Sequence, residues 1–211
     1  MVLLSSNRLE DVPKDAVILT EGEALRLQWE EVDEYRGEQK LWSLRHGASL
    51  LGCLSAATGI YINHHYRSRL RLGKYGAFST YLPIVVLPAL VTTAYHKTFI
   101  QSAIILRQEP CPLCVQIRAS FFQTCCGLVY PAALAPVASY MFAVRQFTYR
   151  LPPFSKPKEL FAVYRKMTKP LSMFFSIALA IHVITAMALT QREILEFHGL
   201  EQETLTKTNL G

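Results

Sequence analysis

The chain alternates between long apolar stretches without charged residues and short connections rich in charge. A helix needs about 20 residues to cross the hydrocarbon core of a bilayer, which is roughly 30 Å thick. Three stretches without Asp, Glu, Lys or Arg have about this length, and they cover residues 75–95, 119–144 and 171–189. The pattern therefore predicts three membrane-spanning helices.

A fourth apolar stretch, residues 47–62, is shorter, with 16 residues before the first strongly polar side chains. It carries small residues at four-residue spacing, Gly52 with Ala56 and Ser55 with Gly59. Small residues let membrane helices approach one another closely. We therefore expect a short interior helix, and a re-entrant or interfacial segment is the alternative. The predicted fold class is an all-α membrane protein with four transmembrane helices.

The second and third predicted spans each contain two prolines five residues apart, Pro83 with Pro88 and Pro131 with Pro136. Proline removes a backbone hydrogen bond and kinks a helix, so we expect both spans to be kinked. A transport pathway is an alternative interpretation of such helices. Transporters usually carry intramembrane ionisable groups, however, and here only His182 titrates near neutrality within the spans.

The connections after the first and third predicted spans are basic, whereas both ends of the chain are acidic. The two connections hold eleven Lys and Arg residues against one acid, Glu159. Basic loops gather on one side of a membrane, so this distribution fits four spans better than three, with both ends on the other side. The predicted domains are an acidic N-terminal extension (1–44), a four-helix transmembrane domain (45–190) and an acidic C-terminal tail (191–211).

Composition agrees with a membrane protein. Of the 211 residues, 51% are hydrophobic and 18% are charged, and the mean hydropathy is +0.19. The chain is thus more apolar and carries fewer charged residues than an ordinary soluble domain. The opening MVLLSSN has too few apolar residues for a secretory signal, and the acid-rich first 44 residues do not fit a cleavable mitochondrial presequence. We expect any organellar targeting signal to lie inside the chain.

Two short amphipathic helices are predicted outside the spans. For each, an ordinary half-solvated helix is the alternative. The first is predicted over roughly residues 21–36, because Thr20 followed by Glu23 fits a capping box. In the third connection, four apolar residues are expected to face the membrane surface: Leu160, Phe161, Tyr164 and Met167. Three basic residues are expected to point toward lipid headgroups: Lys158, Arg165 and Lys166.

Four of the five cysteines lie between Cys111 and Cys126. A zinc site needs four ligands in tetrahedral reach, and the adjacent Cys125 and Cys126 point about 100° apart on a helix, which disfavours a metal. Cys111 and Cys114 form a CxxC motif just before a predicted helix start, a position that favours a reactive thiolate. A redox pair, a structural disulfide and two inert thiols all remain open.

The sequence contains no paired carboxylates, no Ser/His/Asp set and no phosphate-binding GxxxxGK[ST] loop. Catalysis would therefore depend on the thiols alone. We predict a non-enzymatic protein with no catalytic residue, no metal and no cofactor.

The segment PCPLCVQIR resembles the motif of the DsbB family, four-span membrane thiol oxidases that pass electrons from a CxxC to quinone. The resemblance implies an alternative function, a quinone-linked thiol oxidoreductase that uses Cys111 and Cys114, with Arg118 beside the quinone. It covers about nine residues. That family carries its motif ahead of the second span and needs a second cysteine pair in the later loop, where residues 145–169 contain no cysteine.

A longer match is to the transmembrane protein 126 family, small mitochondrial inner-membrane proteins, which the chain resembles over roughly residues 107–195. The motifs are CPLCVQIR, GLVYPAALAPVASYMFAVRQFTYRLPP and RKMTKPLSMFF. The matching positions besides the CxxC cysteines are Arg118, Gly127, Tyr130, Pro131, Arg145, Leu151, Pro152, Lys169 and Pro170.

This resemblance implies a membrane-embedded scaffold that assembles mitochondrial respiratory complex I, the NADH:ubiquinone oxidoreductase, and that crosses the inner membrane several times. One branch of the family belongs to the mitochondrial complex I intermediate assembly complex, and the sister branch is linked to complex I through a different membrane module. The implied protein partners are nascent complex I membrane subunits, ECSIT, an acyl-CoA-dehydrogenase-like factor and complex I intermediate-associated protein 30. The chain is also expected to contact the lipid bilayer, and no nucleic-acid partner is expected. The basic connections would face the matrix.

Overall fold

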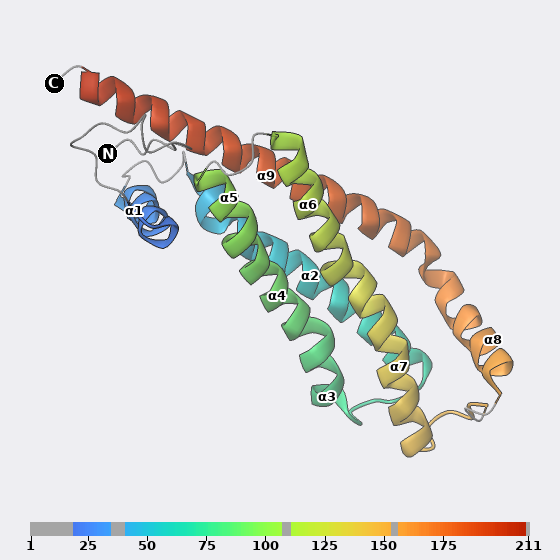
Figure 1. The fold of residues 1–211 in the computed structure, drawn as a ribbon. Helices are drawn as coiled ribbons and strands as arrows, with labels where there is room; N and C mark the ends of the chain where they lie inside the picture. The colour runs from blue at the N-terminus through green and yellow to red at the C-terminus, as the bar shows by residue number, and fades with distance from the viewer. Residues whose placement is uncertain (1–18, 35–40, 107–110, 153–155, 210–211) are drawn as a thin grey trace.

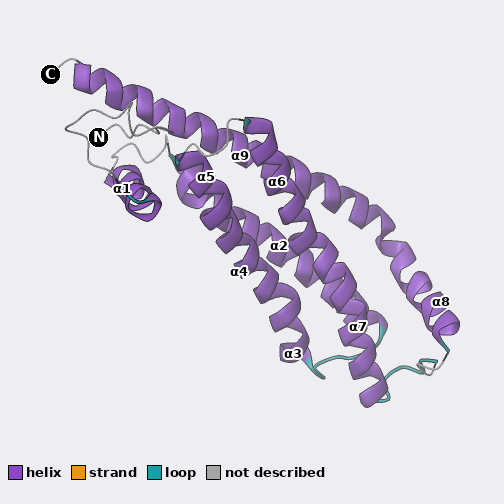
Figure 2. Ribbon diagram, viewed as in Figure 1, coloured by secondary structure: helices purple, strands orange, loops and turns teal. Residues whose placement is uncertain are grey.

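The computed structural model describes residues 19–34, 41–106, 111–152 and 156–209. Outside short turns these residues are helical, and no strand occurs among them (Figure 2). These helices form four long rods, each antiparallel to the one before it in the chain (Figure 1). The predicted all-α class is confirmed.

Each rod after the first combines several helical elements. The first rod is α2 (Trp42–Arg69). The second rod joins α3 (Ala77–Tyr81), η2 (Leu82–Val86), α4 (Leu87–Tyr95), η3 (His96–Gln101) and α5 (Ser102–Ile105). The third joins α6 (Pro112–Thr124), η4 (Cys125–Val129) and α7 (Tyr130–Arg145). The fourth is α9 (Ser172–Asn209), which follows α8 (Pro157–Thr168) and the turn η5 (Lys169–Leu171).

Helix α1 (Glu21–Glu34) and the C-terminal half of α9 lie at one end of the bundle, which we call the acidic end (Figure 1). The connections from α2 to α3 and from α7 to α8 lie at the other end, which we call the basic end. Helix α9 continues through position 191, the predicted start of a separate tail. Its residues Ile194, Phe197 and Leu200 are buried in a core cluster. Helices α2 and α9 therefore both cross the predicted domain boundaries.

Within the described residues, three segments are long and apolar enough to cross a membrane: Ala77–Ile105, Pro112–Arg145 and Pro157–Glu203. Helix α2, the predicted first span, has 28 residues but is not among them. We therefore correct the expectation of four such spans to three. Helix α2 falls short in hydropathy because many of its residues are polar, and it buries five of them: Ser43, Ser55, Thr58, Asn63 and Arg67.

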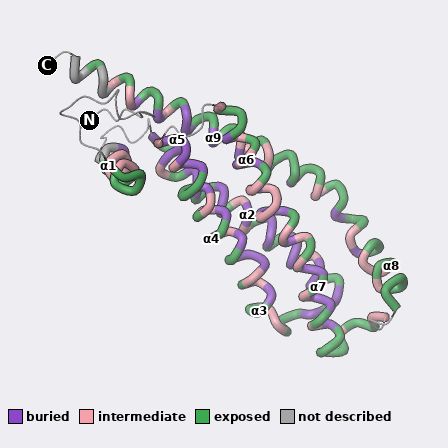
Figure 3. The backbone as a smooth tube through the Cα atoms, in the orientation of Figure 1, coloured by how far each residue is buried: buried purple, intermediate pink, exposed green. Residues whose placement is uncertain are grey.

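Large apolar side chains are exposed on the outer faces of the other three rods. Examples are Phe78, Leu90, Phe121, Met141, Met173 and Ile184. Buried residues occur along the whole length of α2 (Figure 3). An apolar exterior around a partly polar interior is the arrangement expected of a bundle that packs in lipid.

Two of the π-turns lie directly before prolines. Elements η2 and η4 precede Pro88 and Pro131 by one or two residues. Proline has no N–H, and its ring collides with the carbonyl four residues earlier in a regular α-helix. A π-turn, with its i to i+5 hydrogen bonds, widens the helix at that place. In η2, for example, the Leu87 N–H donates to the Leu82 carbonyl, five residues back. Pro88 and Pro131, two of the prolines predicted to kink these spans, thus each follow a π-turn.

Helix α2 approaches the second rod closely at two glycines. A Cβ atom at Gly59 would lie 2.6 Å from the Ile84 carbonyl oxygen. One at Gly52 would lie 3.0 Å from the Ala89 carbonyl oxygen. Side chains at these positions would separate the two helices, so the predicted close packing through Gly52 and Gly59 is confirmed.

The two predicted amphipathic helices pack against the bundle. In α1, Val32 is fully buried, and Leu25 and Trp29 pack against the same core cluster. In α8, three of the four residues predicted to face the membrane surface instead pack inward: Leu160, Tyr164 and Met167. Phe161 is 64% exposed. The orientation predicted for α8 is thus wrong for these three residues, because the bundle provides an apolar surface of its own.

Candidate functional site

Polar groups, most of them buried, form three clusters along α2, which we together call the polar network. The start cluster contains Ser43, His96, Gln101, Glu193 and Glu196. The middle cluster contains Ser55, Thr58, Thr92, Gln123 and His182. The end cluster contains Asn63, Arg67 and Thr80.

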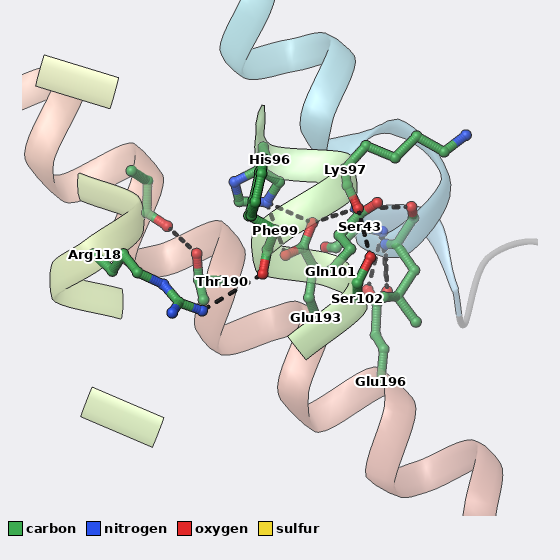
Figure 4. A network of polar contacts seen from close by, with 12 residues as sticks. Ser43, His96, Lys97, Phe99, Gln101, Ser102, Arg118, Thr190, Glu193 and Glu196 are labelled. Carbon is green, nitrogen blue, oxygen red and sulfur yellow. Dashed lines mark hydrogen bonds and ion pairs between the residues drawn. The ribbon is translucent and has the colours of Figure 1, made fainter. Parts of the chain in front are cut away.

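The start cluster surrounds a carboxylate on α9. Glu193 is fully buried, and its two oxygens lie 2.9 and 3.1 Å from His96 Nε2 (Figure 4). Gln101 Nε2 donates to Glu193 Oε1 at 2.8 Å and to the Leu44 carbonyl of α2 at 3.0 Å. A Cβ atom at Gly47 would lie 2.8 Å from Glu193 Oε1, so this glycine leaves room for the carboxylate. These donors offset the large cost of burying a charge.

The π-turn η3 explains why two donors meet at one carboxylate. His96 and Gln101 are five residues apart, and in an α-helix residues at that spacing point about 140° away from each other. The i to i+5 hydrogen bonding of a π-turn brings them to one side. Unlike η2 and η4, η3 is not followed by a proline. Single π-turns recur at functional sites, and this one positions two polar side chains.

Glu196, one turn further along α9, caps the first turn of α2. Its carboxylate accepts hydrogen bonds from the Ser43 N–H at 3.0 and 3.2 Å and from the Leu44 N–H at 3.2 Å (Figure 4). The N-cap residue, Leu41, has no side-chain capping bond. The first N–H groups of a helix lack partners within the helix and carry a partial positive charge. Helix α9 thus supplies a cap that the local sequence lacks.

The middle cluster joins all four rods. Gln123 Nε2 on α6 lies 3.0 Å from His182 Nδ1 on α9, and His182 Nε2 lies 3.0 Å from Thr58 Oγ1 on α2. Because the amide nitrogen can only donate, His182 accepts at Nδ1 and donates from Nε2 in its neutral form. Gln123 Nε2 also donates to Ser55 Oγ at 3.2 Å, and Ser55 Oγ donates to Thr92 Oγ1 of α4 at 3.3 Å.

Gly127, one of the family-motif positions, makes room for the middle cluster. A Cβ atom there would lie 2.5 Å from His182 Cε1 and 2.7 Å from Ser55 Oγ. Gly127 lies in η4, directly before Pro131 at the start of α7. The motif around Gly127 therefore lets the third rod approach α2 and α9 where their polar groups meet.

The end cluster fixes the turn between α2 and α3. Arg67 is 5% exposed, and it donates to Thr80 Oγ1 at 3.0 Å and to the carbonyls of Gly73 at 2.8 Å and Tyr75 at 3.0 Å. Asn63 Nδ2 also donates to Thr80 Oγ1, at 3.3 Å. Arg67 is one of the eleven bases assigned to the two basic connections from the sequence, and the structure instead places it, buried, in the last turn of α2. Its guanidinium instead satisfies carbonyls of a tight turn.

The CxxC lies at the start of α6, as predicted. Cys111 is the N-cap residue, and its Sγ accepts from the Cys114 N–H at 3.4 Å. Cys114 is exposed and Cys111 is half-buried. Arg118, one turn later, donates to the Phe99 carbonyl of η3 at 3.5 Å (Figure 4). A disulfide or redox role for the two thiols stays a prediction.

The remaining motif positions lie away from the polar network. Arg145 ends α7 and is exposed, and Lys169 and Pro170 lie in η5 at the basic end. Tyr130 begins α7, and Leu151 and Pro152 follow in the connection to α8. The structure does not bring these positions together with the cysteines.

Most of the start cluster was not predicted from the sequence. Glu193 and Glu196 had been counted as charges of an acidic tail. Their spacing of three residues, directly after an apolar stretch, was the available signal. Gln123 inside a span was a second signal, because amides within membrane helices usually bond neighbouring helices.

The polar groups of the network are directed mainly at one another. Interhelical hydrogen bonds in membranes contribute about 0.6 to 2 kcal/mol each, so the network stabilises the relative positions of the rods. Among the described residues, no group of three or more His, Cys, Asp or Glu is placed to hold a metal. Three buried amide oxygens have no hydrogen-bond partner among the described residues: those of Asn63, Gln101 and Gln123.

Comparison with known proteins extends over nearly the whole described bundle. The family described as Transmembrane protein 126 matches residues 26–206. Transmembrane protein 126 of Drosophila melanogaster is 43% identical over 192 residues, which are 90% of this chain and 86% of the fly protein. No solved structure matches the chain.

Two mammalian relatives carry a functional name, "Complex I assembly factor TMEM126B, mitochondrial". The proteins of Mus musculus and Rattus norvegicus are each 32% identical over 124 residues, 57% of this chain and 51% of the relative. The chain thus matches about half the length of these two proteins. The match to the Transmembrane protein 126 family includes the CxxC and all three polar clusters. The comparisons give no support to the DsbB-like alternative. The chain belongs to the Transmembrane protein 126 family.

Proposed function

We propose that the chain is a membrane-embedded assembly factor for mitochondrial respiratory complex I. The observation that carries this proposal is the 32% identity to a mouse protein named as a complex I assembly factor. The aligned region covers 57% of this chain. The proposed role is therefore transferred to the whole chain from somewhat more than half of it.

The polar network supports a scaffold in preference to an enzyme. Its described side chains mainly bond one another across four rods, and they leave the apolar outer faces to lipid or to a partner helix. We propose that nascent complex I membrane subunits pack against these outer faces. Membership in the intermediate assembly complex, beside ECSIT, the acyl-CoA-dehydrogenase-like factor and complex I intermediate-associated protein 30, is part of the same proposal.

We further propose that α2 crosses the inner mitochondrial membrane as a fourth span. Its 28 residues correspond to about 42 Å of helix, longer than the roughly 30 Å hydrocarbon core. A helix that directs its polar residues at other helices can lie at membrane depth without a wholly apolar composition. Four spans would place α1 and the end of α9 on one side of the membrane and the basic connections on the matrix side.

The test is native-gel mass-spectrometric profiling of mitochondria, comparing cells that carry the tagged chain with cells that lack it. We expect the chain to migrate with partial complex I, and we expect less fully assembled complex I when the chain is missing. Normal complex I in the deficient cells, together with a tagged chain that migrates alone near its mass of 23.9 kDa, would contradict the proposal.

A further inference from the structure

A groove lies between α2 and α9 in the half of the bundle nearer the basic end. Leu54 and Tyr61 of α2 and Phe174 and Ile181 of α9 are among its lining residues, and its volume is about 290 Å³. The Tyr61 and Phe174 rings stack at 4.2 Å between centroids. The first turns of α9 are largely exposed (Figure 3), so this groove faces the space that lipid occupies.

The lining of the groove suits a hydrocarbon chain. Most of its residues are aliphatic or aromatic. Thr58 and His182 also line it, but Thr58 Oγ1 and His182 Nε2 lie 3.0 Å apart and bond to each other. A ligand in this groove therefore gains apolar contact without having to satisfy these two groups.

The groove spans most of one leaflet of a bilayer. Its lining on α9 runs from Phe174 to His182, inside the apolar stretch 171–189. Between these two residues the helix rises about 12 Å, and half of a hydrocarbon core is about 15 Å. A chain in the groove would thus run from the basic end toward the middle of the membrane.

At the basic end, α2 is fastened to the start of the fourth rod. The Tyr66 hydroxyl and Thr168 Oγ1 lie 2.8 Å apart, and His65 Nε2 lies 3.0 Å from the Met167 carbonyl oxygen. Tyr61, His65 and Arg69 follow one another at four-residue spacing, so they lie on one face of α2. The same face therefore passes from the groove to this corner and ends at a base.

Exposed bases gather at this corner. Arg69 lies one turn beyond His65, Lys169 directly follows Thr168, and Lys166 lies three residues earlier on α8, with all three exposed. Among the described residues of the basic end, the single acid is Glu159, which pairs with Lys156 at 3.0 Å. An unneutralised cluster of bases next to a membrane attracts anionic lipid headgroups.

We propose that the groove binds one acyl chain of an anionic phospholipid, whose phosphate lies among Arg69, Lys166 and Lys169. The apolar lining of the groove favours an acyl chain, and the bases at the corner favour an anionic headgroup. This inference is independent of the proposed role in complex I assembly, because it concerns a lipid and can be tested on the isolated protein.

The test uses the full-length chain, delipidated in detergent and titrated with dioleoyl phosphatidylglycerol or dioleoyl phosphatidylcholine. Native mass spectrometry counts the bound lipids. We expect one lipid to bind, with about tenfold preference for the anionic one. The variant with Arg69→Gln, Lys166→Gln and Lys169→Gln should bind both lipids about equally. The matched control with Arg145→Gln, Arg150→Gln and Lys158→Gln removes the same charge from the same end and should keep the preference.

A second pair of variants tests the groove. Ala57 lines it and is exposed, so Ala57→Phe fills the space and should weaken binding of both lipids several-fold. Ala180→Phe, at an exposed position on α9 outside the groove, is the control and should have no effect. Circular-dichroism melting confirms that each variant is folded.

Four results would overturn the proposal. Equal loss of preference in both charge variants would indicate diffuse attraction, and unchanged binding in Ala57→Phe would show that the groove is not used. Competition by soluble glycerol 3-phosphate as strong as by the lipid would show that the acyl chain contributes nothing. Binding of an acidic peptide to the three bases without any lipid preference would assign the corner to a protein partner.

Discussion

At the acidic end of the bundle, Glu193 is buried and accepts hydrogen bonds from His96 and Gln101, whereas at the basic end Lys166 and Lys169 are exposed to solvent or lipid headgroups. Both ends carry many charges, yet the charges have different physical consequences. A buried carboxylate depends on its partners, because losing them leaves an uncompensated charge. Exposed bases depend little on neighbours. The buried carboxylate therefore helps to fix helix packing at the acidic end, whereas the exposed bases at the basic end remain available for binding.

The largest expected effect is at the start cluster. His96→Leu removes the imidazole beside Glu193, and we expect the free energy of unfolding to fall by roughly 3 to 5 kcal/mol. Denaturant titration in micelles measures the change. The double variant His96→Leu with Glu193→Leu replaces the pair by apolar groups and should recover much of the loss. A single variant as stable as wild type would show that the buried pair does not hold the acidic end together.

Gly127→Ala tests the middle cluster, which lies between the two ends. The added methyl group would overlap with His182, so we expect a loss of about 1 to 3 kcal/mol in the same titration. Gly199→Ala is the matched control, because a Cβ atom there meets nothing within 4 Å. Alanine also favours a helix over glycine by up to about 1 kcal/mol, so the control should be neutral or more stable. Equal effects of the two substitutions would argue against tight packing at Gly127.

Removing the cap on α2 should have a smaller effect. Glu196→Ala removes the acceptor for the Ser43 and Leu44 N–H groups, and lost helix caps cost about 0.5 to 2 kcal/mol. Hydrogen exchange of the first turn of α2 should accelerate more than exchange in its middle. Glu201→Ala, one turn and a half further along α9, provides a comparison, and a uniform increase along α2 would contradict a local cap.

A still smaller and pH-dependent effect is expected at α1. The Thr20 N–H donates to Glu23 Oε2 at 2.9 Å, and this bond together with one from the Thr20 hydroxyl lowers the pKa of the Glu23 carboxyl below its ordinary value of 4.5. A lowered folded-state pKa means that the stabilisation is present above pH 4.5 and is lost as the pH falls through the folded value. Amide exchange in the first turn of α1 should therefore accelerate in acid. Glu23→Gln should abolish this dependence, whereas Thr20→Ala keeps the backbone N–H donor and should only reduce it.

The smallest effect is expected for the CxxC. Under the scaffold proposal, the variant with Cys111→Ser and Cys114→Ser should support near-normal complex I assembly, which native gels measure. The serine hydroxyl at 111 can still accept the N–H of residue 114. A collapse of complex I assembly accompanied by loss of disulfides in other membrane proteins would favour the thiol oxidoreductase instead.

Local signals in the sequence predicted what depends on near neighbours. The capping box of Thr20 and Glu23 is present: the Thr20 N–H donates to Glu23 Oε2 at 2.9 Å, and the Glu23 N–H donates to Thr20 Oγ1 at 3.4 Å. Charge-free stretches also located three of the rods, although the second rod continues past Tyr95 to Ile105. Lys97 had ended that predicted span, but its ammonium group lies over the Trp29 ring at 5.2 Å instead of terminating the helix.

Contacts between distant parts of the chain were not predictable from one sequence. His96 and Glu193 are 97 residues apart, and no local pattern pairs them. The apolar face of a helix such as α8 has the same sequence periodicity whether it packs against lipid or against protein. Here α8 packs against the bundle because Tyr140 and its neighbours lie beside it. Long-range placement therefore determined most of the candidate site.

The cap that Glu196 places on α2 has a consequence for biogenesis. The carboxylate and the Ser43 N–H that it accepts are 153 residues apart in the chain, so the ribosome synthesises the recipient helix long before its donor. The amino-terminal turn of α2 therefore lacks this cap until α9 is in place. A chain that ends before Glu196 leaves the first N–H groups of α2 without this acceptor.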